Sequence, residues 1–421
     1  MSKQQPYPVN APTRTPAFQA RLAKRYAAEK RFKVLGVGAI LFSLAVLLFL
    51  LVTMTFNGIG GFQRVEFSVP IDFTETSISG DPAVLAQVDG INTLEAQGLP
   101  ALVEMATAEA VGRDAAAELA DQAWRDVADA IVADPGMLQR KHTFDLPVSP
   151  DLAAGYSGEG SPGMRALADS LARQGRIAKN FDFGFLTRAD ATSPQQVGIW
   201  GALKGSMLTM LVTLALAFPI GVLAALYLEE YAPRNRWTDL IEVSINNLAA
   251  VPSIIFGLLG LAVFLWMFPG YRSAPLIGGM TLALMTMPVI VISGRNAIKA
   301  VPPSIRDGAL AIGASPVQVV FHHVLPLALP GILTGTIIGM ARALGETAPL
   351  LMIGMRAFVA APPGGFTSPA TVLPVQIFLW SDEIDRGFVE RTSAAIIVLL
   401  LFLLVMNGLA IYLRNKFEKK W

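Results

Sequence analysis

Arg342 and Glu346 stand inside the apolar run Leu325–Ile353, within the stretch MARALGETAPLL. Charges on a helix long enough to cross a membrane are rare, and they usually pair with one another or face a water-filled path. A guanidinium matches a phosphate-like oxyanion through two parallel hydrogen bonds, and a carboxylate four residues away can orient it. The pattern indicates a site for a passing anion, with a purely structural ion pair as the alternative.

Small residues recur every four positions along the same run. Gly331, Gly335 and Gly339 lie about 40° apart on one face of a helix, where small residues let membrane helices approach closely. With Gly331 as the origin, Arg342 and Glu346 fall at about 20° and about 60°. We therefore expect both charges on this close-packing face, away from lipid.

The residues around Glu346 are poor helix formers. Gly345 precedes it and Pro349 follows three residues later. Such breaks are tolerated in membrane helices where neighbouring groups satisfy the freed backbone. We expect the helix to be weakened near Glu346, at a point suited to a moving gate.

The composition is that of a membrane protein. Hydrophobic residues make up 53% of the 421 residues, charged residues 15%, and the mean hydropathy is +0.51; soluble domains are nearer a quarter charged. The absence of cysteine excludes thiolate chemistry and cysteine-held metal sites. The three histidines show no arrangement for nucleophilic catalysis, and no metal-ligand spacing is evident. We expect a non-enzymatic chain with no metal, no cofactor of its own and no nucleic acid partner.

Six segments are long and apolar enough to cross a hydrocarbon core of about 30 Å. They predict an all-α integral membrane protein with six transmembrane helices, and six such runs argue against a hydrophobic soluble protein. The segments are Val34–Phe56, Trp200–Leu228, Ile245–Phe268, Pro275–Ile292, Leu325–Ile353 and Ser393–Leu413.

The distribution of basic residues sets the expected orientation. Residues 1–33 hold eight Lys/Arg and one acid, Glu29, so the N-terminus should be cytoplasmic. With 34–56 as the first transmembrane helix, alternation places the C-terminus, 414–421, on the same side.

Residues 57–198 would then form a large insert on the outer side. The insert holds 20 Asp/Glu and 10 Lys/Arg, a net charge of 10 − 20 = −10. Leu119, Ala123, Val127 and Ile131 form an apolar stripe in a stretch rich in helix formers, while Asp145–Gly163 has the Pro, Gly and Ser of a loop. The insert should be partly helical, either a solvated domain or a docking surface for a soluble partner.

The predicted cytoplasmic loop 301–326 carries strong helix-boundary signals. Ser304 can cap a first short helix, and Gly313 can end it. Ser315 can cap a second short helix, with Pro316 in its first turn and Gln318 completing a capping box. The result would be a rigid hairpin that fits a partner.

This loop resembles the EAA loop of ABC-importer permeases, which inserts into a cleft of a separate ATPase subunit. The matching positions are Asp307, Gly308, Ala309, Gly313, Leu325 and Pro326. The spacing agrees throughout, whereas Asp307, Gly308 and His323 depart from the residue types of the pattern.

A second resemblance narrows the family. The stretch GETAPLL (Gly345–Leu351) resembles the signature of the A-type permeases of bacterial phosphate ABC importers, and three further stretches agree with it. These are YLEEYAP (Tyr227–Pro233), AVPSIIFGL (Ala250–Leu258) and VLPVQIF (Val372–Phe378). The resemblance implies a five-helix ABC-importer core over 199–413, with the first helix and the insert as additions.

The resemblance also implies partners and a location. A sister permease, two ATP-binding subunits that carry ATP–Mg, and a periplasmic phosphate-binding protein would assemble with this chain in the bacterial inner membrane. The chain has no G-x-x-x-x-G-K-[ST] run, so ATP hydrolysis is expected on the partners.

Arg295 is a second candidate for the substrate path, with a basic residue flanking a membrane helix as the alternative. Other readings are a permease for another oxyanion or small solute, and a membrane signalling subunit with a regulatory partner.

Overall fold

The computed structural model describes residues 16–74, 76, 78, 90–355, 358–359, 361–385 and 387–417. The first part of the predicted cytoplasmic N-terminus, 1–15, and residues 418–421 of the C-terminus lie outside the described residues. The chain divides into two compact units, Met1–Asn57 and Gly58–Trp421.

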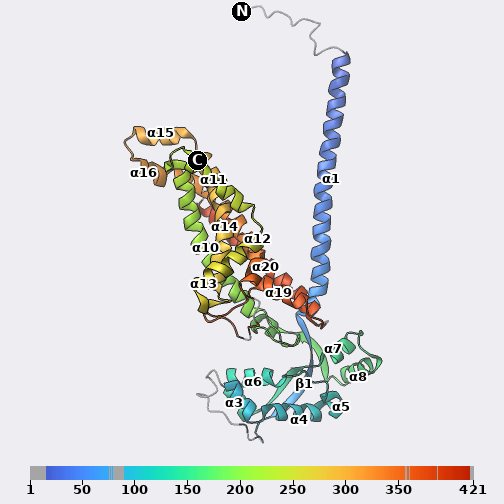
Figure 1. Cartoon of the computed structure of the whole chain (residues 1–421). Helices are drawn as coiled ribbons and strands as arrows, with labels where there is room; N and C mark the ends of the chain where they lie inside the picture. Colours follow the sequence, from blue (N-terminus) through green and yellow to red (C-terminus); the bar gives the residue numbers. More distant parts are fainter. Residues whose placement is uncertain are drawn as a thin grey trace, which may run out of the picture. The chain divides into compact units, whose positions relative to one another are not determined.

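The described part of the first unit is one continuous helix. α1 (Pro16–Gly61) has 46 residues and ends just inside the second unit, as Figure 1 shows. It contains the predicted transmembrane segment 34–56, and Phe18–Gly61 is long and apolar enough to span a membrane. A span needs only about 20 residues, so α1 is long enough to extend beyond the bilayer.

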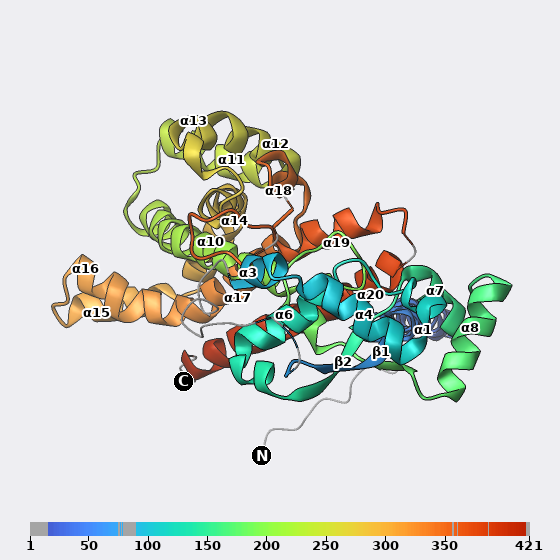
Figure 2. The ribbon, with the colours of Figure 1, turned by 90° about the horizontal axis from the view of Figure 1, so that it is seen from below.

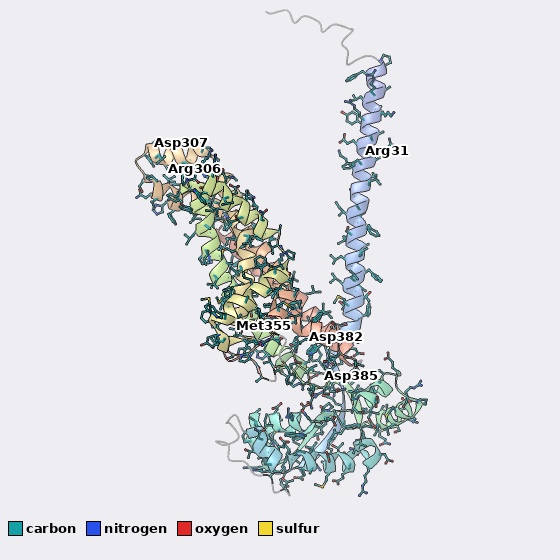
Figure 3. All side chains as sticks on the ribbon, in the orientation of Figure 1. Arg31, Arg306, Asp307, Met355, Asp382 and Asp385 are labelled. Carbon is teal, nitrogen blue, oxygen red and sulfur yellow. The ribbon has the colours of Figure 1, made fainter. Side chains whose placement is uncertain are left out.

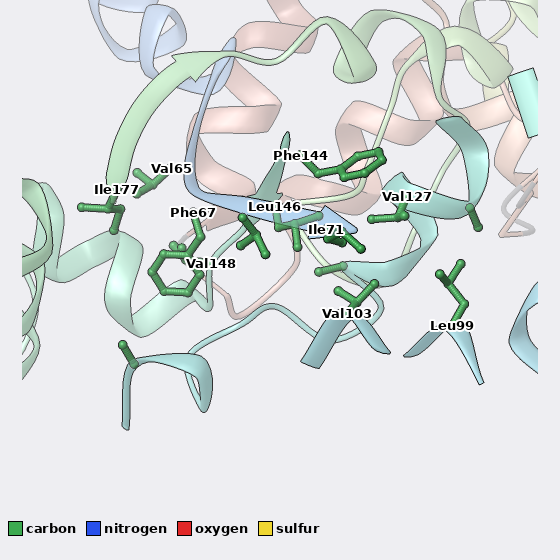
Figure 4. Packing of buried hydrophobic residues seen from close by; sticks show 14 of the residues in the cluster. Val65, Phe67, Ile71, Leu99, Val103, Val127, Phe144, Leu146, Val148 and Ile177 are labelled. Carbon is green, nitrogen blue, oxygen red and sulfur yellow. The ribbon is translucent and has the colours of Figure 1, made fainter. Parts of the chain in front are cut away.

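Residues 63–198 of the second unit form a mixed α/β domain, called here the insert domain. Three antiparallel strands make a sheet of order β2–β1–β3: β1 (Gln63–Asp72), β2 (Lys141–Pro147) and β3 (Ile177–Phe181). Phe67 of β1 lies opposite Leu146 of β2 and Ile177 of β3. These side chains pack with Val103 and Val127 from the covering helices to form the domain's core (Figure 4).

Most helices of the insert domain lie between its strands in the sequence, and α9 follows β3. They are α3 (Gly90–Ala96), α4 (Leu99–Val111), α5 (Arg113–Ala116), α6 (Trp124–Ala133), α7 (Pro150–Tyr156), α8 (Pro162–Arg173) and α9 (Phe183–Thr187). The predicted apolar stripe is buried at Ala123, Val127 and Ile131. The predicted loop Asp145–Gly163 is wrong, because Ser149 and Ser161 each cap a helix with a proline in its first turn. The sheet also means that the all-α description fits the membrane helices but not the insert.

The membrane portion of the second unit is helical. Its main helices are α10 (Trp200–Leu226), α11 (Arg236–Ala249), α12 (Ser253–Leu259), α13 (Leu265–Met267), α14 (Pro275–Lys299), α15 (Pro303–Ala311), α16 (Pro316–Gln318), α17 (Leu325–Gly345), α18 (Ala348–Met352), α19 (Leu373–Ser381) and α20 (Gly387–Phe417). Among the described residues, five helices could cross a membrane, or six if one bent pair counts as a span.

That bent pair corrects the third predicted span, 245–268. Instead of one straight helix, α11 and the segment Ser253–Met267 meet at an angle of 105°. The break falls at Pro252, which has no N–H to continue the helical hydrogen bonds and disfavours helical geometry in the residue before it. The bend lets α12 lie beside α18, where Gly257 approaches Pro349 (Figure 2).

The three glycines of α17 face α14. A Cβ atom built on Gly331 would lie 2.6 Å from the Cβ of Ala297, one on Gly335 would collide with Ser293, and one on Gly339 would lie 2.9 Å from Thr286. Those separations are shorter than van der Waals contact. The two helix backbones therefore pack at a distance that only glycine permits at these positions.

Replacing Gly335 by alanine should loosen this packing. Forcing a methyl group into a filled interface typically destabilises by about 1–3 kcal/mol, so the thermal unfolding midpoint of the purified chain in detergent should fall. Gly408→Ala in α20 is the matched control, because its new Cβ would meet nothing within 4 Å among the described residues. Equal midpoints for the two variants would contradict the close packing of α14 and α17.

Candidate functional site

Helix α17 stops immediately before the glutamate of the GETAP stretch. Glu346 has an extended backbone (φ −77°, ψ 125°), and α18 begins two residues later with Pro349 in its first turn. The predicted interruption near Glu346 is confirmed. Because the backbone leaves the helix here, Glu346 stands at a joint between two helical segments.

Arg342 lies on the last turn of α17 and contacts Glu346. The distance from Arg342 Nε to Glu346 Oε1 is 3.4 Å. The Glu346 side chain is 18% exposed, whereas the Arg342 side chain is 50% exposed in the isolated chain. The structure therefore brings the two residues together, but the expectation that Arg342 lies on the close-packing face is wrong: the glycine face of α17 packs against α14, whereas half of the Arg342 side chain is exposed.

A cavity beside α17 is lined mostly by apolar side chains, with Thr336 and Asn407 as its polar members, and Arg342 does not line it. It has a volume of about 250 Å³ and lies between α10, α17 and α20, lined by side chains such as Leu214, Ile337 and Leu403. None of the described residues that line the cavity is charged, and an ion is disfavoured in such mostly apolar surroundings. The open side of Arg342 is therefore the better place for an anion than this cavity.

Arg295, the second candidate, lies near the end of α14 and is held by two carboxylates. Its Nη1 lies 2.8 Å from Glu242 of α11, and its Nε lies 3.3 Å from Glu229. Only 14% of its side chain is exposed. With both edges of the guanidinium engaged, Arg295 joins three helices in this conformation and would have to change partners to hold an anion.

The hairpin formed by α15 and α16 has the predicted turn and second cap, but the expected second short helix is wrong, because α16 continues through a π-helical segment, Val319–Val324, into α17. Gly313 has φ +89° and ends α15, with hydrogen bonds from Gly313 N to Leu310 O and from Ala314 N to Ala309 O. Ser315 and Gln318 form the reciprocal capping box. The expected cap at Ser304 is wrong, since Pro302 is the N-cap and Ser304 lies inside the first turn.

The same hairpin presents its tip to solvent. Asp307 and Gly308 are exposed, Ala309 is buried against the membrane helices, and Leu325 and Pro326 are partly buried where α17 begins. Large apolar side chains stand out at the tip; they are Leu310, Ile312 and Val317. A rigid, capped hairpin with exposed apolar residues is suited to insertion into a cleft on another protein.

Sequence reasoning missed a buried ion cluster where α20 meets the insert domain. Arg391 of α20 is 4% exposed, and its Nη2 lies 2.8 Å from Oδ2 of Asp182. Arg188 lies 2.8 Å from the other oxygen of Asp182, and Arg64 of β1 lies 2.8 Å from Asp126. The only sequence signal for this cluster was the presence of charged residues at the edges of apolar segments. That signal does not identify the pairs, because the paired residues lie up to 209 positions apart in the sequence.

Glu66 on β1 completes the cluster. It accepts from Arg64 Nε at 2.8 Å and from Asn180 Nδ2 at 3.1 Å. Burial raises the pKa of Glu66, although Arg64 and Asn180 oppose that shift. For Arg64 burial acts to lower the pKa, but Asp126, Asp182 and Glu66 outweigh it and the pKa is raised. The guanidinium groups of this cluster are therefore paired structural charges rather than free anion sites.

Two known families match the chain. Residues 217–419 match the family described as binding-protein-dependent transport system inner membrane component. Residues 19–165 match a domain of unknown function, DUF3333. The ion cluster thus connects the two matched regions, since Arg64, Glu66 and Asp126 lie in the second and Arg391 in the first.

Curated relatives agree with the first match. The chain is 30% identical over 251 residues to the probable ABC transporter permease protein YqgI of Bacillus subtilis, covering 56% of this chain and 85% of the relative. It is 31% identical over 225 residues to the phosphate transport system permease protein PstA of Yersinia pestis, covering 53% and 73%. Against PstA 1 of Mycobacterium tuberculosis the match spans about half of the relative's length.

A solved chain of the inward-facing MetNI methionine ABC transporter is similar over 52% of this chain and 98% of its own length, with a TM-score of 0.41 and 17% identity. By the sequence matches, this chain belongs to the family of binding-protein-dependent transport permeases of the inner membrane. Members of this family are non-catalytic, multi-pass subunits of ABC transporters.

Removing one carboxylate charge tests the buried cluster. Asp182→Asn keeps a side-chain oxygen for the bond from Phe185 N but leaves Arg391 without its counter-charge. Breaking a buried pair in this way costs about 3–5 kcal/mol, so denaturant unfolding of the purified chain should shift strongly. Asp134→Asn, whose pair with Arg140 is about half exposed, should cost less than about 1 kcal/mol; shifts of equal size would show that the cluster is not a structural tie.

Proposed function

We propose that this chain is a permease subunit of an ATP-driven phosphate importer and forms the translocation path together with a sister permease. The observation that carries the proposal is the half-open Arg342–Glu346 pair at the break between α17 and α18. Family membership supports the transport role, and relatives named as phosphate permeases support the substrate.

The geometry of the pair suits an anion that must bind and then leave. Glu346 engages Nε on one edge of the guanidinium at 3.4 Å, which is a loose contact. Among the described residues, no hydrogen bond to either Nη group of Arg342 is observed, so both can offer N–H donors to phosphate oxygens. Glu346 partly offsets the positive charge of Arg342. Phosphate would therefore bind weakly and be released readily.

The exposed half of Arg342 also indicates where the sister permease belongs. A charged side chain on a membrane helix faces a bundle interior or a water-filled path. Packing of a second permease across α17 would enclose Arg342 in a path between the two subunits. Gly331, Gly335 and Gly339 would keep α17 against α14 within each subunit.

The two ends of α10 support a division between outer and inner faces. The insert domain leads into Trp200 at the start of α10, and the α15–α16 hairpin is tied to Glu230 just beyond its end. A helix of this length covers about 40 Å. The insert domain would face the periplasm and its binding protein, whereas both termini and the hairpin would face the cytoplasm and two ATPase subunits.

Transport would proceed by alternating access. ATP binding by the partner subunits, which carry ATP–Mg, would displace the α15–α16 hairpin and open the path past Arg342 to the outside. ATP hydrolysis would reverse the change. The joint at Glu346 lets α18 move relative to α17 without bending a continuous helix.

Substituting Arg342 tests the substrate assignment. In proteoliposomes containing the assembled transporter, Arg342→Ala should reduce phosphate uptake at least about tenfold, since a hydrogen bond to a charged group contributes about 1.5–3 kcal/mol. Arg342→Lys should retain part of the activity, because it keeps the charge but not the planar fork. Arg234→Ala, an exposed arginine between α10 and α11, is the control.

Uptake that survives Arg342→Ala unchanged would overturn this role for Arg342. Uptake of sulfate or molybdate in preference to phosphate would redirect the proposal to another oxyanion. Loss of a phosphate-dependent signalling response without loss of uptake would favour a sensing subunit instead.

Purification of the chain from native membranes tests the assembly. We expect an ATPase and a second permease of similar hydropathy to remain bound in mild detergent, and mass spectrometry would identify them. A stable chain that purifies without either partner would contradict the proposed architecture.

A further inference from the structure

We propose that Glu230 and Arg306 form a clasp that makes the α15–α16 hairpin move as one body with α10 and α14, so that displacement of the hairpin reaches the membrane helices. The inference rests on the proposed function, because it explains how the hairpin transmits force from the ATPases. Glu230 belongs to the YLEEYAP stretch at the end of α10, and Arg306 lies on α15 immediately before Asp307 (Figure 3).

The clasp is a multiple contact rather than an ordinary surface ion pair. Arg306 Nη2 and Nε donate to Glu230 Oε1 at 2.7 and 3.1 Å. The two side chains are 22% and 12% exposed. Partial burial and contact through both N–H donors of one guanidinium edge distinguish this pair from exposed pairs, which contribute little.

Arg306 also donates to two backbone carbonyls where α14 ends. The helical hydrogen bonds stop at this point because Pro302 has no N–H, and Ile298 O on the last turn of α14 accepts instead from Val301 N at 3.2 Å. Arg306 Nη2 donates to that carbonyl at 3.0 Å, and its Nη1 donates to Val301 O at 2.7 Å. One guanidinium therefore binds α15 to the end of α14 and to the end of α10 at the same time.

The segment between α14 and α15 explains why a clasp is needed. Residues 300–302 link the two helices, and Pro302 and Pro303 both lack backbone donors. Without the side-chain hydrogen bonds of Arg306, a displacement of α15 would be taken up by backbone rotation in this linker and would not move α14. With them, Arg306 is bonded to Ile298 of α14, to Val301 in the linker and to Glu230 beyond α10.

A neighbouring set of ion pairs extends the same connection. The end of α10 widens into a π-helical turn, Tyr227–Tyr231, in which Ala232 N donates to Tyr227 O. Glu229 in this turn lies 3.3 Å from Arg295 and 3.6 Å from Lys299 of α14, and Arg295 also lies 2.8 Å from Glu242 of α11. The adjacent acids of one turn thus bind two different elements, α14 through Glu229 and α15 through Glu230.

Spin-label distances test the clasp directly, because the chain has no cysteine and single labels can be placed without background. Labels at Ser304→Cys on α15 and Leu223→Cys on α10 occupy exposed positions away from the apolar tip of the hairpin. In the assembled transporter in nanodiscs, the distance should be narrow and equal with and without ATP. In Glu230→Gln it should broaden and shift on ATP binding, whereas Asp239→Asn, an exposed acid on α11, should match the wild type.

Transport stoichiometry gives the second measurement. Phosphate taken up per ATP hydrolysed should fall about tenfold in Glu230→Gln, a size typical of coupling between distant sites, and Glu230→Asp should restore part of it. A purely structural role would lower assembly without changing this ratio. Arg306→Lys provides a second variant if Glu230→Gln does not assemble, since lysine cannot donate to the carboxylate and both carbonyls in the same geometry.

The clasp is overturned if the label distances and the uptake ratio of these variants equal those of the wild type, or if the wild-type distance itself shifts with ATP. If the wild-type transporter takes up no phosphate, the proposed substrate fails, but the label distances still decide whether the hairpin and α10 move together.

Discussion

An arginine in apolar surroundings must have its charge and its N–H groups satisfied, and the junctions of this molecule depend on that constraint. Arg391 meets it with Asp182 and backbone carbonyls where α20 joins the insert domain. Arg306 meets it with Glu230 and two carbonyls where the α15–α16 hairpin joins the membrane helices. Each guanidinium fixes several chain segments to one point, so the contacts that satisfy the charge also define how the parts of the second unit are joined.

Arg342 departs from this pattern, and the departure is informative. Its contact with Glu346 is longer than those of Arg391 with Asp182 and Arg306 with Glu230, and half of its side chain is exposed. The backbone near Arg342 is also interrupted. Helix α17 ends at Gly345, and Pro349 of α18 packs against Gly257 of α12. A loosely paired charge at a joint between helices can exchange partners and shift position, whereas the tightly held arginines cannot do so without breaking a junction.

Local features of the chain could be predicted from its sequence, and long-range pairings could not. Apolar length predicted the membrane helices, glycine and proline predicted the break at Glu346, and a Ser-x-x-Gln pattern predicted the cap at Ser315. The sheet was missed because β2 and β3 are short, and because the pairing of Phe67 with Leu146 spans a stretch dominated by helix formers. The clasp and the buried cluster join residues far apart in the sequence, and nothing in the local pattern of a charged residue identifies its partner.

One guanidinium touches both ends of the insert domain. Arg391 Nη1 donates to Gly61 O, just before β1, and its Nε donates to Pro194 O, shortly before α10. The chain therefore leaves the membrane region and returns to it at nearly the same place, which is the arrangement that lets a whole domain be gained or lost as a cassette. The path between Trp200 and the end of α20 does not run through this domain, and residues 19–165 and 217–419 match separate families, as expected of a modular chain.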